Sequence, residues 1–422
     1  MSDLERGNPG PVIIHNGRRR EQLRSIEQNM IKVMHVITTL GPAGAENMLC
    51  GIASAMDGTR FENEVVSLTG ILDLADRMQA IGVRVRTLHM KKSVPNPLLV
   101  WRLARWIRES KPDVIHTWMY HANLVGSLAA LLAGNVPVVW GIHHSVLDPR
   151  VDKRRTMFVN RACALLSGKL PARIVFCSQA AVQIHKEIGY DTEKLEVIPN
   201  GFDLQQVKPD PAAHASVRKE LGVPADAVLI GMAARFHPYK DHRNFLRAAG
   251  QLHRKKPEVQ FLLCGMNVDM QNAQLAAWIG EEDLPGCVHL LGARRDMSRL
   301  FAAMDIATTS SLSEAFPIAI GEAMASGTPC VVTDVGDSAL IVGDTGDVVP
   351  PGDPQALALA WERLMEAGPE MRRRLGIAAR RRVQQHFALP SIVERYQAVY
   401  SELASTAPPP SLPAPNLSEC AR

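Results

Sequence analysis

Two carboxylates and the expected start of a helix lie close together in the segment 313–330. Pro317 suits the first turn of a helix, because its missing N–H would have no intrahelical partner there, and a glycine and a proline follow where the helix should stop. We therefore predict a short helix over 317–326, whose first amides are free to bind an anion. Glu314 precedes this helix and Glu322 lies on it. The pattern predicts a phosphate-sized site flanked by two carboxylates.

Two cations lie on another loop that follows an expected strand. Arg235 comes just after the apolar run 228–233, and Lys240 opens the expected helix 242–253. Two cations at the carboxyl end of a strand can neutralise a diphosphate as its negative charge develops. Simple exposure to solvent is the alternative for this pair.

A pair of histidines follows the expected strand 138–142. His143 and His144 are adjacent, so their side chains point in opposite directions on an extended chain and at most one faces a cleft. A structural role is the alternative for a histidine at the end of a strand, and the same alternative applies to His116.

A glycine loop separates the expected strand 33–37 from the expected helix 45–55. Its spacing, Gly41-x-x-Gly44, allows backbone amides to approach a diphosphate, with the helix start directed at the charge. Packing of a strand against a helix explains such a turn equally well. The spacing is not the G-x-G-x-x-G of dinucleotide-binding enzymes, which argues against nicotinamide or flavin chemistry.

Strands and helices alternate along most of the chain, a pattern typical of parallel sheets wound by right-handed crossovers. The predicted fold class is α/β, with two doubly wound parallel-sheet domains that face a central cleft. The predicted division is a disordered leader (1–29), a first α/β domain (30–205), a second α/β domain (206–387), a last helix (388–404) and a proline-rich disordered tail (405–422).

Composition narrows the function classes. The chain has 422 residues and a net charge of +4, with basic residues spread along it, which gives little support to nucleic-acid binding. Seven cysteines form no C-x-x-C pair, so we expect buried thiols in a reducing cytosol and no disulfide framework. The spacing of cysteines, histidines and aspartates predicts no metal site. No secretory signal is expected, and the most apolar span, 124–142, is interrupted, so no transmembrane segment is expected.

The expected helix 97–109 interleaves two tryptophans with three arginines. A basic and aromatic helix face can dock on an anionic membrane surface. A partly buried helix with a solvated stripe is the alternative, and the commoner explanation of such a pattern.

The motif residues resemble a known family. The run Ser-Glu-Ala-Phe-Pro-x4-Glu-Ala-Met-Ala-x-Gly-x-Pro, which contains Glu314 and Glu322, resembles the Glu-x7-Glu motif of the large retaining glycosyltransferase family that includes bacterial mannosyltransferases and sucrose synthases. The resemblance extends over about 31–403. It is reinforced by Arg235 and Lys240, by Val197-Ile198-Pro199-Asn200-Gly201, by the loop 41–46 and by Val331-Val332-Thr333-Asp334-Val335-Gly336.

The resemblance implies a GT-B fold, with the acceptor on the first domain, the nucleotide sugar on the second and a last helix that returns to the first. It implies that Glu322 holds the ribose, that Glu314 engages the donor sugar, and that His143 lies near the transferred sugar. The implied catalytic residues are Glu314, His143, Arg235 and Lys240. The implied donor-binding residues are Gly44, Arg235, Lys240, Phe316, Pro317, Ile318, Ala319 and Glu322. The sequence departs from the family where the loop 41–44 lacks an adjacent glycine pair and where Pro317 replaces a frequent glycine.

The predicted function is therefore transfer of a sugar, with retention and without a metal or other cofactor, from a nucleotide diphosphate sugar to a hydroxyl acceptor. We expect a sugar or lipid-linked sugar acceptor in bacterial surface polysaccharide or glycolipid synthesis. The expected location is the cytoplasm, with peripheral contact at the inner face of the membrane as a further hypothesis. A nucleotide-sugar 2-epimerase of the same architecture is the alternative, and a non-catalytic sugar-nucleotide-binding protein is a third hypothesis. The Glu314 to Gly327 signature favours the transferase.

Overall fold

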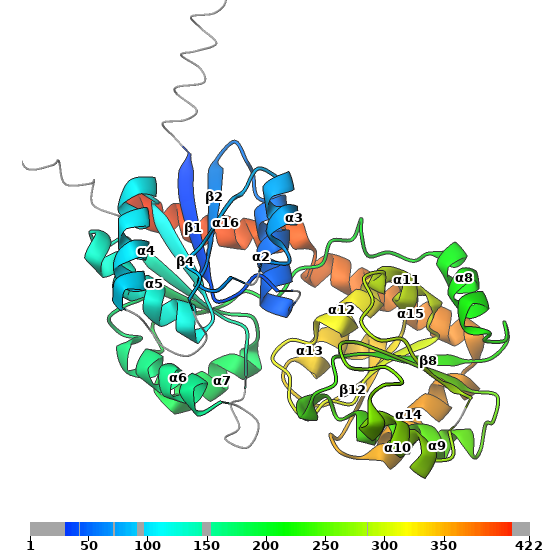
Figure 1. The fold of residues 1–422 in the computed structure, drawn as a ribbon. Coiled ribbons are helices and arrows are strands. Elements are labelled where there is room, and N and C mark those ends of the chain that lie inside the picture. The colour runs from blue at the N-terminus through cyan, green and yellow to red at the C-terminus, as the bar shows by residue number, and fades with distance from the viewer. Residues whose placement is uncertain are drawn as a thin grey trace, which may run out of the picture.

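The structure is a computed structural model that describes residues 30–41, 43–70, 72–90, 97–145, 153–284 and 286–406. These residues form two α/β domains side by side, with the last helix lying along the first domain (Figure 1). The expected leader 1–29, and all but the first two residues of the expected tail, lie outside the described residues.

The N-terminal domain contains a parallel sheet of seven strands in the order β3-β2-β1-β4-β5-β6-β7. Central strands such as β4 and β5 are buried along their whole length, as expected for a sheet with helices on both faces. The strands are β1 (Ile31–Ile37), β2 (Phe61–Ser67), β3 (Arg84–Thr87), β4 (Val114–Trp118), β5 (Val138–Ile142), β6 (Arg173–Phe176) and β7 (Leu195–Val197).

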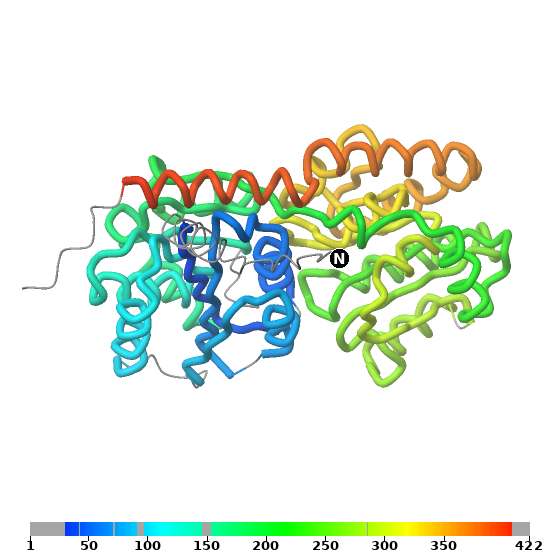
Figure 2. The backbone as a smooth tube through the Cα atoms, turned by 90° about the horizontal axis from the view of Figure 1, so that it is seen from above, coloured from blue at the N-terminus to red at the C-terminus, as the bar shows by residue number. Residues whose placement is uncertain are grey.

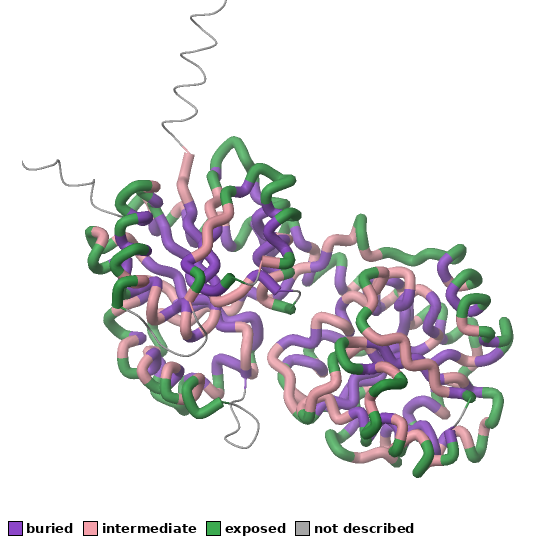
Figure 3. Tube along the Cα trace, in the orientation of Figure 1, coloured by how far each residue is buried: buried purple, intermediate pink, exposed green. Residues whose placement is uncertain are grey.

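Helices cover both faces of this sheet. One face packs against α2 (Gly44–Ala55), α3 (Ala75–Ala80) and α16 (Leu389–Thr406). The other face packs against α4 (Pro97–Ser110), α5 (Tyr120–Ala133), α6 (Arg154–Leu166) and α7 (Gln179–Ile188). The buried residues of the two layers, purple in Figure 3, form the core of the domain.

The C-terminal domain repeats this plan with a parallel sheet of six strands in the order β10-β9-β8-β11-β12-β13. The strands are β8 (Leu229–Ala233), β9 (Gln260–Cys264), β10 (Val288–Leu290), β11 (Ile306–Thr309), β12 (Cys330–Thr333) and β13 (Gly346–Val349). The helices are α8 (Pro211–Leu221), the 3₁₀ turn η1 (Pro238–Lys240), α9 (His242–His253), α10 (Ala273–Glu281), α11 (Met297–Ala303), α12 (Ile318–Ala325), α13 (Ser338–Val342), the 3₁₀ turn η2 (Gly343–Thr345), α14 (Pro354–Glu366) and α15 (Gly368–His386).

Two chain segments cross between the domains side by side. Phe202 donates its amide to the carbonyl of Phe387, and Leu389 donates its amide to the carbonyl of Phe202. After this crossing α16 packs seven buried side chains against the N-terminal domain, from Leu389 to Leu403. Figure 2 shows α15 along one domain and α16 along the other. The two domains are therefore connected by two segments of backbone that are hydrogen-bonded to each other.

The predicted fold class is confirmed, and several elements were not predicted. Strands β7 and β13 and helices α7 and α13 have no counterpart in the prediction. Strand β7 has 3 residues and α13 has 5, too few to show a clear period, whereas α7 has 10 residues and was missed. The predicted helix 317–326 was wrong by one residue at each end, since α12 runs from Ile318 to Ala325 with Pro317 as its N-cap. Lys240 ends the turn η1 and does not open α9.

All six described cysteines are buried and unpaired, as predicted from their apolar surroundings. Burial raises the pKa of the Cys163, Cys177 and Cys264 thiols to about 12, so they stay protonated. Within the described ranges, no helix is both long and apolar enough to cross a bilayer.

Candidate active site

The order of strands reverses once in each sheet, between β1 and β4 and between β8 and β11. Ligands of open α/β sheets bind beyond the carboxyl ends of the strands at such a switch point. Arg235 and Lys240 follow β8, and Glu314 follows β11. The topology therefore places the predicted C-terminal site residues at one switch point, and Gly44 follows β1 at the other.

Lys240 and Glu314 form an ion pair in the C-terminal domain. The carboxylate of Glu314 also accepts a hydrogen bond of 2.7 Å from the Ser311 hydroxyl. The Glu314 side chain is 9% exposed, so this charge is largely removed from water and needs both partners. A lysine has three N–H donors, which leaves Lys240 with donors for a diphosphate while it holds Glu314.

The start of α12 faces the N-terminal domain. A Cβ atom on Gly44 would lie 3.0 Å from Cδ1 of Ile318, so the start of α2 touches the start of α12 across the cleft. The first amides of α12, on Ile318 and Ala319, have no intrahelical acceptor. The ring of Phe316 packs in the domain core beside Phe202, at 6.2 Å between centroids, so only its backbone can face a ligand.

Glu322 is a half-buried carboxyl group on the second turn of α12. Burial raises its pKa to about 7, and no described charge or hydrogen-bond donor opposes that shift. A carboxylate with no partner is costly to bury and is more typical of a ligand site than of a structural position. Among the described residues of this domain, Glu322 is thus the strongest candidate for a carboxylate that binds a ligand.

Arg235 is exposed two residues beyond β8, and none of the described residues forms an ion pair with it. Its loop is held by Gly265, whose φ is +149°, and a Cβ there would lie 2.2 Å from the Ala234 carbonyl oxygen. Only glycine fits this approach. The structure therefore leaves the Arg235 guanidinium available to a ligand at the same switch point as Lys240.

His143 lies directly after β5 and stacks on Trp118, with 5.0 Å between ring centroids and 17° between ring planes. Burial lowers the pKa of His143 to about 4, and the Asn200 side chain opposes this effect only in part. The ring is therefore neutral near pH 7. It can donate or accept a hydrogen bond, but it does not supply a positive charge.

A buried cluster of rings packs around Trp118. His116 lies 4.4 Å from Trp118 between ring centroids, and its Nδ1 is 2.7 Å from the Tyr400 hydroxyl of α16. Trp118 donates its indole N–H to Nδ1 of His35, and burial lowers the pKa of His35 to about 4. His116 is therefore a buried structural residue, the alternative that the sequence left open. Helix α16 therefore contributes Tyr400 to the cluster around Trp118, the ring on which His143 stacks.

Two contacts join the domains beside these residues. The Ser145 hydroxyl donates to the carbonyl oxygen of Glu314 at 2.7 Å. The carboxylate of Asp337 accepts the first two amides of α7, from Gln179 at 2.8 Å and Ala180 at 2.9 Å. Burial raises the pKa of Asp337, while the two amides act in the opposite direction. An aspartate of one domain therefore caps a helix of the other.

Sequence reasoning did not identify Ser145, Ser311 or Asp337. Ser145 follows the two histidines, Ser311 precedes the motif and Asp337 follows Gly336, so all three flank segments that were singled out. Serine and aspartate are common in loops, and their partners lie in distant or separate segments. Their position next to a motif was the signal in the sequence that could have identified these three residues.

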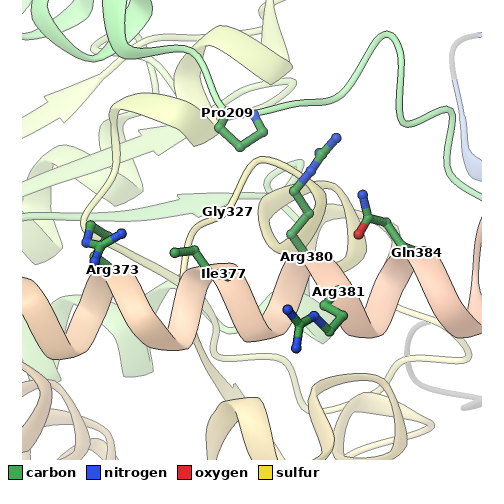
Figure 4. Close-up of a pocket in the computed structure, with 7 residues that line it drawn as sticks. All are labelled: Pro209, Gly327, Arg373, Ile377, Arg380, Arg381 and Gln384. Atoms are coloured by element: carbon green, nitrogen blue, oxygen red, sulfur yellow. The ribbon is translucent and has the colours of Figure 1, made fainter.

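Outside the cleft, a hollow of about 330 Å³ lies between α15 and the linker at Pro209 (Figure 4). Arg380 lines it and donates to the carbonyl of Val207 at 3.1 Å and to that of Ala325. This side chain ties the linker to the end of α12. In the part of the chain that the structure describes, no three His, Cys, Asp or Glu side chains gather as metal ligands would.

Comparison with known families matches both domains. Residues 42–206 match the family described as Glycosyltransferase Family 4, and residues 227–367 match the family described as Glycosyl transferases group 1. The matches end within the linker region on either side, so each family profile corresponds to one domain of the fold.

Curated relatives are similar over most of their length. The UDP-Gal:alpha-D-GlcNAc-diphosphoundecaprenol alpha-1,3-galactosyltransferase of Escherichia coli is 26% identical over 325 residues, which is 75% of this chain and 83% of the relative. The N,N'-diacetylbacillosaminyl-diphospho-undecaprenol alpha-1,3-N-acetylgalactosaminyltransferase of Campylobacter jejuni is 24% identical, over 65% of this chain and 73% of the relative. Both relatives are transferases, and the comparisons give no support to the epimerase alternative.

Solved structures give the same result. Anabaena HepE in complex with UDP and glucose is 25% identical with a TM-score of 0.77, over 88% of this chain and all of that one. Sucrose-phosphate synthase from Thermosynechococcus elongatus, at 20% identity and a TM-score of 0.76, shares the fold. With one glycosyltransferase family model matched to each domain and the fold shared with these structures, the chain belongs to the glycosyltransferases of GT-B fold.

Proposed function

We propose that this chain is a retaining glycosyltransferase that moves a sugar from a UDP-sugar to a hydroxyl of a lipid-linked sugar. The observation that carries the proposal is Glu322, a half-buried carboxyl with a raised pKa and no described partner, one turn into α12 and on the same segment as Glu314 of the Lys240–Glu314 pair. The choice of UDP is supported by the E. coli relative's name and by the UDP complexes of HepE. The lipid-linked acceptor is supported by the names of the E. coli and C. jejuni relatives.

The donor is held by the C-terminal domain. The ribose diol donates to Glu322, because a diol with two O–H donors suits a carboxylate that has no other partner. The diphosphate lies between the first amides of α12 and the cations Arg235 and Lys240, where helix dipole and side-chain charge act together. Gly44 allows the N-terminal loop to close over the diphosphate without a side chain in the way.

The reaction breaks the bond between C1 of the sugar and the diphosphate oxygen, and the electron pair stays on that oxygen. The cations and the α12 amides stabilise the charge that develops there. The acceptor oxygen bonds to C1 from the face that the diphosphate leaves, so configuration is retained, and the acceptor proton passes to the departing phosphate. Glu314 orients the sugar hydroxyls near the reacting face, and neutral His143 hydrogen-bonds the same sugar from the N-terminal domain.

No metal or other cofactor takes part in this scheme. Two side-chain cations and a helix start supply the positive charge that a divalent ion supplies in other transferases. Addition of a chelator should therefore leave the transfer rate unchanged.

The reaction is placed in bacterial surface polysaccharide or glycolipid assembly, in the cytoplasm at the inner face of the membrane. The supporting observations are the buried, unpaired thiols of all six described cysteines, as expected in a reducing compartment, and relatives whose names include diphosphoundecaprenol or diphospho-undecaprenol.

Thermal unfolding with a panel of UDP, GDP and ADP tests the donor class, because a ligand that binds only the native state raises its stability. We expect UDP to raise the Tm of the wild type and to have much less effect on Glu322→Gln. A larger shift with GDP or ADP would contradict the UDP assignment.

The product distinguishes transfer from epimerisation. We expect the purified chain, a UDP-sugar and a lipid-linked diphosphate sugar to give a new glycoside with the anomeric configuration of the donor, read by proton NMR coupling constants. Inversion at C1 would remove the retaining mechanism. Conversion of the UDP-sugar to its 2-epimer without an acceptor would remove the transferase.

A further inference from the structure

The helix layer formed by α4, α5 and α6 exposes an unusual number of large apolar side chains. These helices pack side by side on one face of the N-terminal sheet (Figure 1), and each of them has large apolar side chains exposed on its outer side. Seven large apolar residues are exposed on this surface, namely Leu98, Trp101, Leu128, Leu131, Leu132, Phe158 and Leu165. We call this surface the outer helix face. Large apolar side chains that are exposed on three neighbouring helices point to an interaction site.

The exposure of individual side chains shows that these residues do not belong to the core. Phe158 is 74% exposed and Leu165 is 82% exposed, both on α6. The two tryptophans of α4 differ in exposure, since Trp106 is buried in the core facing the sheet and Trp101 is 55% exposed. The commoner explanation of the α4 pattern, a partly buried helix with a solvated stripe, therefore accounts for Trp106 and leaves Trp101 unexplained.

The same face carries a strong positive charge. The three helices contain six arginines, all exposed, and one acidic residue, Glu109. The arginines are Arg102, Arg105, Arg108, Arg154, Arg155 and Arg161. Along α6, Arg154, Phe158, Arg161 and Leu165 follow one another at helical spacing, so charge and apolar surface alternate on one stripe. The α5 helix between its neighbours contains no Asp, Glu, Lys or Arg.

We infer that the outer helix face docks on an anionic lipid bilayer. Aromatic and aliphatic side chains enter the boundary between headgroups and acyl chains, while arginines pair with lipid phosphates at the surface. A second copy of this chain fits less well, because a twofold contact would set six arginines against six arginines. The inference depends on the proposed function only in that docking brings the cleft to a lipid-linked acceptor.

The face is placed suitably for that role. Helix α5 precedes β5 and α6 follows it in the chain, and the carboxyl end of β5 leads to His143 and Ser145 at the cleft. Docking through α5 and α6 therefore holds the bilayer on the domain that we assign to the acceptor.

Vesicle flotation of the full chain tests the inference. The vesicles contain either phosphatidylcholine alone or phosphatidylcholine with about one third phosphatidylglycerol, and binding is measured in about 0.1 M and about 0.5 M salt. We expect the wild type to float with the anionic vesicles at low salt, and to float weakly with neutral vesicles or at high salt.

Two double variants separate charge from apolar contact. We expect Arg154→Glu with Arg161→Glu, and separately Phe158→Ser with Leu165→Ser, to lower the partition coefficient by at least about tenfold. The matched control is Ile377→Ser with Arg381→Glu, an exposed apolar and basic pair on α15 of the other domain (Figure 4), which should bind as the wild type does. A UDP-induced rise in Tm shows that each variant is folded with an intact donor site.

Three results would overturn the inference. They are absence of wild-type binding to anionic vesicles at low salt, unchanged binding by either face variant, and a wild-type dimer in solution that the Phe158→Ser, Leu165→Ser variant dissociates. The vesicles carry neither donor nor acceptor, so the result does not depend on the sugar that is transferred. A chain that binds vesicles but transfers no sugar would remove the proposed function and leave the docking face intact.

Discussion

The two sides of the cleft differ in how they hold charge. The C-terminal side presents the Lys240–Glu314 ion pair, the exposed Arg235 and the half-buried Glu322. The N-terminal side presents His143, neutral near pH 7 and stacked on Trp118 above a buried aromatic cluster. The difference matches the two substrates that we propose, since a UDP-sugar carries charge at its diphosphate and an acceptor hydroxyl is neutral. It also predicts that substitutions on the C-terminal side have the larger effects.

The largest effect is expected at the ion pair. Lys240→Ala and Glu314→Gln should each lower kcat by about 10²–10³-fold, because each removes a group aimed at the reacting sugar or the departing diphosphate. Initial rates with UDP-sugar and acceptor give the measurement. Lys255→Ala, which breaks a Lys–Glu pair with Glu362 on the outside of the same domain, is the control and should leave kcat unchanged. Near-normal turnover by either cleft variant would show that the C-terminal side is not the catalytic half.

The next effect is expected at Glu322. Glu322→Gln should weaken UDP binding about 10–100-fold, the range for loss of hydrogen bonds to a charged group. Titration calorimetry with UDP gives the measurement. Glu258→Gln, an exposed glutamate of the same domain, is the control and should not change the affinity. Equal affinities of wild type and Glu322→Gln would contradict the ribose assignment.

Glu322 should also make stability and UDP affinity depend on pH near neutrality, whereas His143 on the N-terminal side should not. Burial raises its pKa from an ordinary 4.5 to about 7, so its contribution to stability is full below about 4.5 and is lost as pH rises through about 7. UDP binding favours the ionised carboxylate, so UDP affinity should rise between about pH 6 and pH 8. Glu322→Gln should remove this rise in affinity. A rise that persists in that variant would mean that another group titrates. His143, with a pKa of about 4, should not titrate in this range.

A moderate effect is expected where the two sides touch. Gly44→Ala brings a Cβ to 3.0 Å from Cδ1 of Ile318, so the start of α2 or of α12 must move slightly. We expect kcat/KM to fall about threefold to tenfold, by analogy with small errors in positioning. Ile318→Val removes Cδ1 and should restore the rate in the double variant. Gly58→Ala, with no atom within 4 Å, is the neutral control. Failure of the second substitution to restore activity would mean that Gly44 acts through something other than this contact.

The smallest effect is expected at Ser145. Ser145→Ala removes one hydrogen bond to the Glu314 carbonyl, worth about 0.5–1.5 kcal/mol, so kcat/KM should fall by less than about tenfold. Ser54→Ala, which removes a local bond to Cys50 within α2, controls for loss of a serine hydroxyl. A loss as large as that of Lys240→Ala would place Ser145 among the groups that touch substrate, and the charge difference between the two sides would no longer explain the activity.

Much of the fold could be predicted from the sequence because its signals are local. The strand at 138–142 and the helix at 242–253 match β5 and α9 residue for residue, since each is an apolar pattern with clear ends. The motif spacing also placed Glu314 before α12 and Glu322 within it. The short elements β7 and α13 gave no such signal, and their positions depend on the sheet they join.

What the sequence by itself determined was the type of fold, the start of α12 to within a residue, and a set of candidate groups for sugar transfer. Only the tertiary structure decided which of them meet. Lys240 and Glu314 are 74 positions apart, yet they form an ion pair. Asp337, which was not a candidate, contacts Gln179 across 158 positions. The tertiary structure also decided that His116 is buried, that Glu322 has no partner and that Trp101 faces outward while Trp106 does not. The physical reason is that periodicity and capping act between near neighbours, whereas partners and burial depend on how strands order themselves in a sheet.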